Sequence, residues 1–357
     1  MMVLLALLAA TVPFEQMARE ASAEREANHL ERAVALYSEG VARKKDWAEG
    51  WWYLGTIAYD RDRYGEAAGH FRQFLKLKPD IAAGWDFLGL CEFGTRDDAA
   101  ALGDLIRAEQ FGAPEEHVAQ VAEFHRVILL TRAGRFDEAM GRVTRAATRL
   151  AASDDWYVAA GLAGLRRPLL PTELRVGERP LVRGTGEAIW LQANRRTDDA
   201  LRTYEALAAR YPDASGLHFL FGSCLLGKNV ERGLAELEKE LAIKPDHVPA
   251  LVVLSQQALT RGNLQEAATW GRRAVEVAPS DFAAHLAYGR VLAQQELYGE
   301  SVREFEGAKA LAPGSPEIRF ALASAYAKSG KPAEAAAERA EFLKLRKLRE
   351  AQSPGRP

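Results

Sequence analysis

Apolar and polar residues alternate along most of the chain with the period of an amphipathic helix, in runs that are cut at regular intervals. The clearest cuts are prolines that follow such a run. Pro212, Pro245, Pro279 and Pro313 recur at a nearly constant spacing, and Pro79 precedes Pro212 by close to four such periods. Because proline cannot continue a helix interior, each of them marks a helix end. The pattern therefore predicts a repeat of about 34 residues.

A second signal divides each period into two helices. A glycine or another turn residue is followed by an acidic residue and then an alanine, as in Gly262, Glu266 and Ala267. Glycine tolerates the left-handed backbone that closes a helix, and a carboxylate in the first turn complements the dipole of the next helix. The alanine lets the two helices cross closely. One such hairpin cannot bury its apolar face alone, so we expect successive hairpins to stack.

These positions resemble the tetratricopeptide-repeat (TPR) family, in particular its exported bacterial members. With Ala48 as the first position, the landmarks of the family fall on Trp51, Leu54, Gly55, Ala58, Ala67, Phe71, Phe74 and Pro79. A frame that starts at Phe282 matches at Tyr288, Gly289, Leu292, Phe305, Ala308 and Pro313. The resemblance implies an all-α fold, a right-handed α-solenoid of stacked antiparallel helix pairs.

We expect five segments: a signal-like apolar leader (1–13), an N-terminal TPR array (14–166), a Pro-rich insertion or joint (167–183), a C-terminal TPR array with a capping helix (184–350) and a disordered tail (351–357). Three prolines interrupt helix in the joint, which we expect to divide the solenoid. A tolerated surface insertion is the alternative. The repeat at 116–151 is degenerate, because Glu123 and Arg126 stand where large apolar residues belong.

In TPR proteins the first helices line a concave groove, and the resemblance transfers this role to residues of several repeats. The candidate groove residues are Trp52, Tyr59, Asp86, Phe93, Phe124, Phe219, Gln256, Arg290 and Phe320. Aromatic anchors of this kind suit a helix or an extended peptide laid in a groove. The alternative is that some of them pack on one another or on the leader.

Composition and spacing argue against several other functions. The net charge of -2 gives no electrostatic reason to expect a nucleic-acid partner. His117 and His125 do not have the three- or four-residue spacing that places two metal ligands on one helix face. Cys91 and Cys224 are far apart in the sequence, and no ligand cluster surrounds either. Without a phosphate loop or a nucleophile elbow, we expect no enzyme activity, no cofactor and no metal site.

The sequence therefore predicts a non-catalytic scaffold that binds a protein or peptide partner of unknown identity. Two alternatives stay open. One is a structural subunit of a cell-envelope assembly that self-associates as a homo-oligomer. The other is the recognition subunit of an enzyme complex.

The stretch from Met1 to Pro13 carries no charged side chain, and the apolar run is too short to span a bilayer as a helix. We accordingly expect no integral membrane span. The run resembles the apolar core of a secretory signal, although no basic residue precedes it and no clean cleavage site follows it. We expect export to the periplasm or cell envelope if this leader is a signal, and a cytoplasmic protein otherwise.

Overall fold

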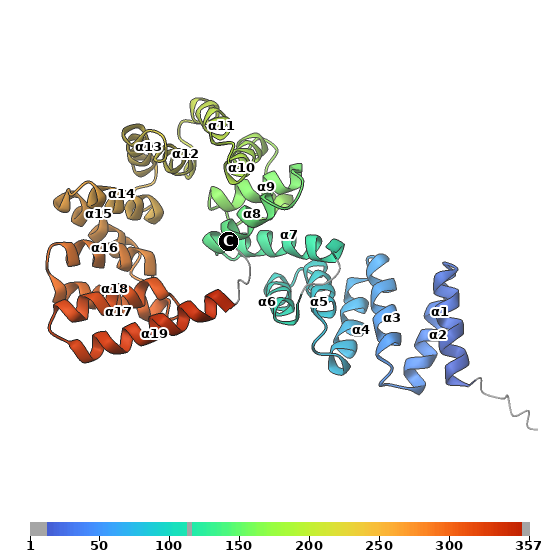
Figure 1. The fold of residues 1–357 in the computed structure, drawn as a ribbon. Helices are drawn as coiled ribbons and strands as arrows, with labels where there is room; N and C mark the ends of the chain where they lie inside the picture. Colours follow the sequence, from blue (N-terminus) through green and yellow to red (C-terminus); the bar gives the residue numbers. More distant parts are fainter. Residues whose placement is uncertain (1–12, 113–115, 352–357) are drawn as a thin grey trace, which may run out of the picture. The chain divides into compact units, whose positions relative to one another are not determined.

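The computed structural model describes residues 13–112 and 116–351, and these residues form paired helices without any strand (Figure 1). The prediction of an all-α array of helix pairs is confirmed. Apart from Pro13 and Ala351, the expectations for the leader and the tail lie outside the described residues; Ala351, predicted as the start of the tail, is the last residue of the final helix. Among the described residues, no helix is both long and apolar enough to cross a membrane.

The chain divides into two compact units between Asn194 and Arg195. The helices of unit 1 are α1 (Phe14–Glu26), α2 (Leu30–Arg43), α3 (Ala48–Asp60), α4 (Tyr64–Leu77), α5 (Ala82–Gly94), α6 (Asp98–Ala108), the 3-10 turn η1 (Glu109–Phe111), α7 (Glu116–Arg132), α8 (Phe136–Ala147), α9 (Asp154–Gly164), the 3-10 turn η2 (Pro171–Glu173) and α10 (Arg179–Ala193). Those of unit 2 are α11 (Thr197–Arg210), α12 (Leu217–Leu225), α13 (Val230–Ile243), α14 (Val248–Thr260), α15 (Leu264–Val277), α16 (Phe282–Gln294), α17 (Tyr298–Leu311), α18 (Pro316–Lys328) and α19 (Pro332–Ala351).

The Pro-rich segment, which we expected to be the joint, lies inside unit 1. It connects α9 to α10, and these two helices pack closely against each other. The other domain limits stay a prediction.

A residue with a left-handed backbone ends the first helix of most pairs. Asn28, Asp62 and Arg96 have φ values of 60°, 56° and 65° and follow one another at the interval of the repeat. Gly262 and Gly330, with φ of 77° each, take the same place later in the chain. The predicted glycine turn is therefore confirmed where glycine is present, and other residues adopt the same conformation elsewhere at a cost of about 1 kcal/mol.

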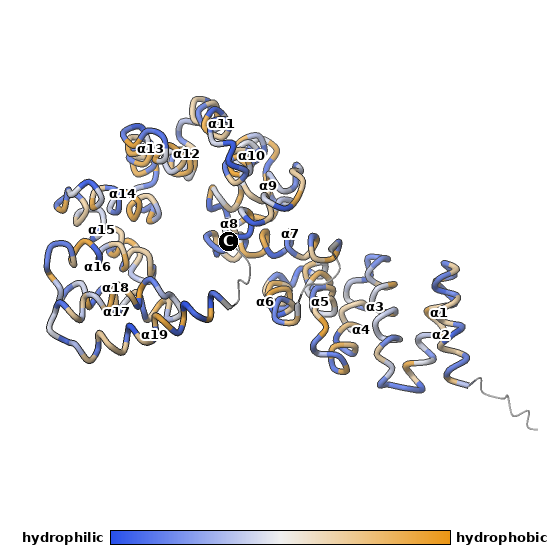
Figure 2. Tube along the Cα trace, in the orientation of Figure 1, coloured by the Kyte–Doolittle hydropathy of each residue, from blue (hydrophilic) through white to orange (hydrophobic). Residues whose placement is uncertain are grey.

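The two helices of a pair cross closely where a glycine of the first helix faces an aromatic ring of the second. A Cβ added to Gly55 would lie 2.8 Å from the ring of Phe71, and one added to Gly289 would lie 2.6 Å from the ring of Phe305. Phe71 and Phe305 are buried in consequence. Figure 2 shows hydrophobic and hydrophilic stretches alternating along the helices, as this packing requires.

A recurring hydrogen bond spans the connection between successive helix pairs. A side chain early in the first helix donates to the backbone carbonyl of the residue six positions before it. The pairs are Trp51 to Lys45 (2.9 Å), Trp85 to Pro79 (2.8 Å), His218 to Pro212 (2.8 Å), His285 to Pro279 (2.9 Å) and Arg319 to Pro313 (3.2 Å). Each bond occupies a carbonyl that the turn leaves without a helical partner.

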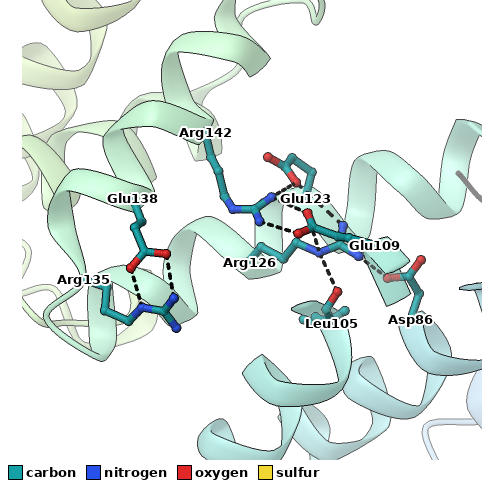
Figure 3. A network of polar contacts seen from close by, with 8 residues as sticks. All are labelled: Asp86, Leu105, Glu109, Glu123, Arg126, Arg135, Glu138 and Arg142. Atoms are coloured by element: carbon teal, nitrogen blue, oxygen red, sulfur yellow. Dashed lines mark hydrogen bonds and ion pairs between the residues drawn. The ribbon is translucent and has the colours of Figure 1, made fainter. Parts of the chain in front are cut away.

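The degenerate repeat replaces apolar packing by ion pairs (Figure 3). Arg126 of α7 is buried, donates to the carboxylate of Asp86 in α5, and bonds the carbonyl of Leu105 at 2.9 Å. Asp86 is 0% exposed and its second oxygen has no hydrogen-bond partner among the described residues. Burial raises the pKa of Asp86 to about 6, although the Arg126 guanidinium opposes this shift.

We expect Asp86→Ala to lower the free energy of unfolding by about 3–5 kcal/mol, because it leaves the buried Arg126 charge uncompensated. The double change Asp86→Leu/Arg126→Leu should recover most of this loss, since it replaces the ion pair by apolar packing. Urea unfolding, monitored by circular dichroism, measures the free energy of unfolding of both variants. A double variant as unstable as the single one would contradict this account.

The α9–α10 pair brings two helix backbones into contact through glycine. A Cβ on Gly161 would lie 1.8 Å from the carbonyl oxygen of Val182, and one on Gly186 would lie 1.7 Å from that of Tyr157. No side chain fits at either position without separation of the helices.

We expect Gly161→Ala to destabilise the protein by about 3 kcal/mol or more, because the clash is with backbone that cannot rotate away. Gly103→Ala in α6 is the matched control: its Cβ would meet nothing within 4 Å, and alanine should stabilise that helix by up to about 1 kcal/mol. Equal effects of the two changes on the unfolding midpoint would argue against the close α9–α10 contact.

A buried carboxylate makes the stability depend on pH near neutrality. Glu92 is 5% exposed and accepts a hydrogen bond of 2.8 Å from Arg72. Burial raises its pKa to about 7, with Arg72 opposing the shift and Asp104 adding to it. The folded chain therefore holds this proton more tightly than the unfolded chain does.

The contribution of Glu92 to the free energy of unfolding should accordingly rise by about 1–2 kcal/mol as the pH falls from about 8 to about 5. His70 and His125, whose pKa values burial lowers, contribute in the opposite direction, so the comparison between variants carries the test. Glu92→Gln should remove much of this rise, while Asp86, with its pKa of about 6, keeps a part of it. The exposed Glu276→Gln change is the control. Urea unfolding at a series of pH values measures how the free energy of unfolding changes with pH. The same pH dependence in Glu92→Gln as in the unchanged protein would refute the role assigned to Glu92.

Candidate functional site

A hollow of about 770 Å³ in unit 1 brings together residues of five helices, α3 to α7, and of the Pro-rich segment. We call it the aromatic pocket, after the side chains that surround it. Its aromatic and aliphatic lining consists of Tyr59, Tyr64, Leu90, Phe93, His125 and Leu170. Tyr59 and Phe93 are candidate groove residues that stand one repeat apart, so stacking of the repeats places them in the same pocket.

The rings of the pocket hold one another in place. Tyr59 meets Tyr64 edge to face at 5.6 Å, and Phe93 meets His125 in the same way at 4.8 Å. Gly94 makes room for Tyr64, because a Cβ there would lie 2.4 Å from the tyrosine ring. Such pairs are stiff and present apolar faces to a ligand.

The polar atoms of these rings are neutral hydrogen-bonding groups near neutral pH. Tyr64 donates to Asp62 at 2.6 Å, and this bond is the main reason why its pKa rises to about 12. Burial raises the pKa of Tyr59 and lowers that of His125. The Nδ1 of His125 lies 2.8 Å from the carbonyl of Val121, so the neutral ring donates there and its Nε2 is an acceptor.

The Pro-rich segment forms one wall of the pocket and is fixed by Arg132 of α7. The Arg132 guanidinium donates to the carbonyl of Pro168 at 3.1 Å and to the carboxylate of Glu173 at 2.9 Å. Glu173 also accepts from the backbone N–H of Leu170 at 2.9 Å. These contacts hold Leu170 over the ends of the first helices. Hydrogen bonds therefore fix the position of this wall of the pocket.

The rim of the pocket carries both signs of charge. Arg132 lies 3.9 Å from Asp98 in addition to its pair with Glu173. Arg96 also lines the pocket and makes no ion pair with a described residue. The lining of the pocket therefore includes one cation that has no ion-pair partner among the described residues.

The other candidate residues of unit 1 lie outside this pocket. Asp86 is not a groove residue, because it is fully buried in its pair with Arg126. Trp52 contacts the rings of Phe71, Phe74 and Phe87, and Phe124 contacts those of His125 and Trp156. Both aromatic side chains are half-buried and contribute to packing between repeats.

In unit 2, Arg290 and Phe320 share a pocket of about 400 Å³. Arg290 pairs with Glu317, and Phe320 is 59% exposed with its ring 5.6 Å from that of Phe342. Phe219 and Gln256 do not line this pocket. The Phe219 ring lies 4.9 Å from that of His247, and the Gln256 carbonyl accepts from Thr260.

The sequence analysis did not identify five residues of the aromatic pocket: Tyr64, His125, Arg132, Leu170 and Glu173. Tyr64 is not one of the candidate groove positions, and His125 was considered only as a metal ligand, because of its spacing from His117. The proline pattern did mark the segment that holds Leu170 and Glu173. Its path over the first helices depends on Arg132, which no local signal connects to it.

Within residues 13–112 and 116–351, no group of three or more His, Cys, Asp or Glu side chains could hold a metal ion. Cys91 and Cys224 are free and buried, and burial raises the pKa of both thiols. A raised pKa keeps a thiol in its unreactive form.

Solved structures that resemble this chain include TPR proteins at low sequence identity. A crystal structure of MamA is 16% identical, with a TM-score of 0.42, over 46% of this chain and 97% of MamA. Residues 41 to the end of MamA from Desulfovibrio magneticus RS-1 are 17% identical, with a TM-score of 0.42, over 46% of this chain and 94% of the other. YrrB, described as a TPR protein with an unusual peptide-binding site, is 17% identical, with a TM-score of 0.39, over 46% of this chain and 86% of YrrB.

No curated protein matches the sequence significantly. A family model described as tetratricopeptide repeat matches residues 19–80, 56–117, 185–248 and 253–316. The stretch 118–184, which holds most of the degenerate repeat and the Pro-rich segment, lies between these matches. Since the matches cover well over half of the sequence, the chain belongs to the tetratricopeptide-repeat family, whose repeats serve as scaffolds for protein interaction.

Proposed function

We propose that this protein is a non-catalytic scaffold that holds a segment of a partner protein or peptide in the aromatic pocket of unit 1. The observation that carries the proposal is the convergence of Tyr59 and Phe93, one repeat apart, beneath a wall that the Pro-rich segment supplies. An apolar side chain of the partner would enter between these rings, which is the kind of buried anchor that dominates binding energy at interfaces.

The polar groups of the pocket suit a peptide backbone. The Nε2 of His125 would accept a hydrogen bond from the peptide, and Arg96 would donate to one of its carbonyl or carboxylate groups. The neutral tyrosines and the inert thiols supply no nucleophile, which supports the non-catalytic part of the proposal. Export of the protein through its leader remains part of the proposal.

A self-associating structural subunit is the second candidate. It is favoured by the exposed Phe320 beside Phe342 in unit 2, an apolar surface outside the aromatic pocket. Sedimentation of the purified protein distinguishes the two candidates, because a monomer at working concentration excludes the structural subunit.

Phe93→Ala/Leu170→Ser should abolish partner binding without unfolding the protein, since it removes one ring and one wall residue of the pocket. The measurement is affinity capture from native extract, with helicity followed by circular dichroism. We expect a loss of at least about tenfold in the captured partner, because two apolar anchors are worth more than about 1.4 kcal/mol together.

Phe282→Ala/Leu311→Ser in unit 2 is the matched control. It makes the same changes at two exposed residues, of which Phe282 is 46% and Leu311 43% accessible to solvent. A partner retained by the pocket variant, or lost equally from the control, would exclude the aromatic pocket. Substrate turnover by the purified chain would overturn the non-catalytic assignment.

A further inference from the structure

A second hollow of about 520 Å³ lies at the opposite end of the α7–α8 pair from the α7–α8 turn. We call it the basic pocket. It shares no lining residue with the aromatic pocket. Its charged lining comprises the guanidinium groups of Arg126, Arg142, Arg145 and Arg149 and the carboxylates of Glu109 and Glu123.

Both carboxylates are already used by Arg142. Its guanidinium lies 2.8 Å from Glu109 and 2.7 Å from Glu123, as Figure 3 shows. Arg126 is held by Asp86 and the Leu105 carbonyl, and it lies 3.7 Å from each of the two glutamates. The inner part of the pocket is thus a closed network.

Arg145 and Arg149 remain outside this network. Neither guanidinium forms an ion pair or a hydrogen bond with a residue of the described part of the chain. Burial acts to raise the pKa of Glu109, but Arg142, Arg126 and Arg145 hold it below its ordinary value. The pocket therefore has an excess of positive charge, and both exposed arginines are available to a ligand.

The positions of three arginines along the pocket indicate the spacing of charges in the ligand. Arg142 and Arg145 lie on α8, and Arg149 follows in the turn after Ala147, yet all three line the pocket. The backbone N–H of Leu150 donates to the carbonyl of Ala146 at 2.8 Å, as in a further helical turn, so Arg145 and Arg149 lie about one turn, or about 5.4 Å, apart. In an extended peptide, side chains on the same face repeat every two residues, or about 6.6 Å.

We propose that the basic pocket binds an acidic, extended peptide segment, with carboxylates two residues apart paired to Arg145 and Arg149. Ala146 and Leu150 line the same hollow and would contact the peptide's apolar atoms. The fixed carboxylates of Glu109 and Glu123 disfavour a doubly charged phosphate more than a singly charged carboxylate at each arginine. The recess also admits a chain more readily than a flat lipid surface.

The test uses the full chain and a fluorescein-labelled peptide in which glutamate alternates with serine. Fluorescence anisotropy should show saturable binding that weakens with salt. Arg145→Gln/Arg149→Gln should lower the affinity by at least about tenfold, because two charge-assisted contacts are lost. Both residues are exposed, and the helicity and unfolding midpoint of the variant should therefore be unchanged.

Arg303→Gln/Arg339→Gln is the matched control, since it removes the same charge from exposed positions of unit 2. An equal loss of affinity in the control variant would show that the effect depends on net charge alone, and it would overturn the proposal. No binding of the glutamate peptide would also overturn it, as would tighter binding of the same peptide carrying phosphoserine. Phe93→Ala/Leu170→Ser should leave this binding intact, so failure here and failure at the aromatic pocket are separable.

Discussion

Within each unit, a helix pair leaves one apolar face uncovered, and the array holds together because the next pair covers it. The rest of the architecture serves this contact. Small residues such as Gly55 admit the large rings of the second helices, and left-handed residues at fixed intervals reverse the chain without side-chain collisions. Neighbour-on-neighbour stacking also brings equivalent positions of successive repeats side by side. Tyr59 and Phe93 reach a common pocket for this reason.

Two places depart from apolar stacking, and both candidate sites lie next to them. At α7, Arg126 replaces an apolar landmark, and its charge is balanced by Asp86 from two helices back. The network that results keeps polar side chains at the surface of the basic pocket. At α9–α10, glycines bring the two helix backbones into contact. The long Pro-rich connection between these helices lies over the first helices, where Arg132 holds it.

Local signals were enough to predict the period, the paired helices and the degenerate repeat. Glycine, alanine and proline act within a few residues of their own position, and a single sequence shows them. Asp86 was misjudged because its burial depends on Arg126, 40 residues away. The aromatic pocket was half predicted: repeat position identified Tyr59 and Phe93, whereas the wall depends on contacts of Arg132 with residues 36 and 41 positions distant. Side chains of this kind are brought together by the path of a loop, which no periodicity encodes.

The hydrogen bond between successive pairs has a further consequence: it sets the length of the connection that it spans. Donor and acceptor are six residues apart in all five cases, and one added or deleted residue would rotate the donor by about 100° around its helix. Insertions and deletions are therefore costly at those connections and tolerated where no such bond forms. The connection that leads into α7 is of the second kind, since Ala119, at the donor position of α7, has no side-chain donor. In an array built on this rule, new binding surfaces can evolve by changes of loop length only at such unbridged junctions, while the bridged ones keep the repeats in phase.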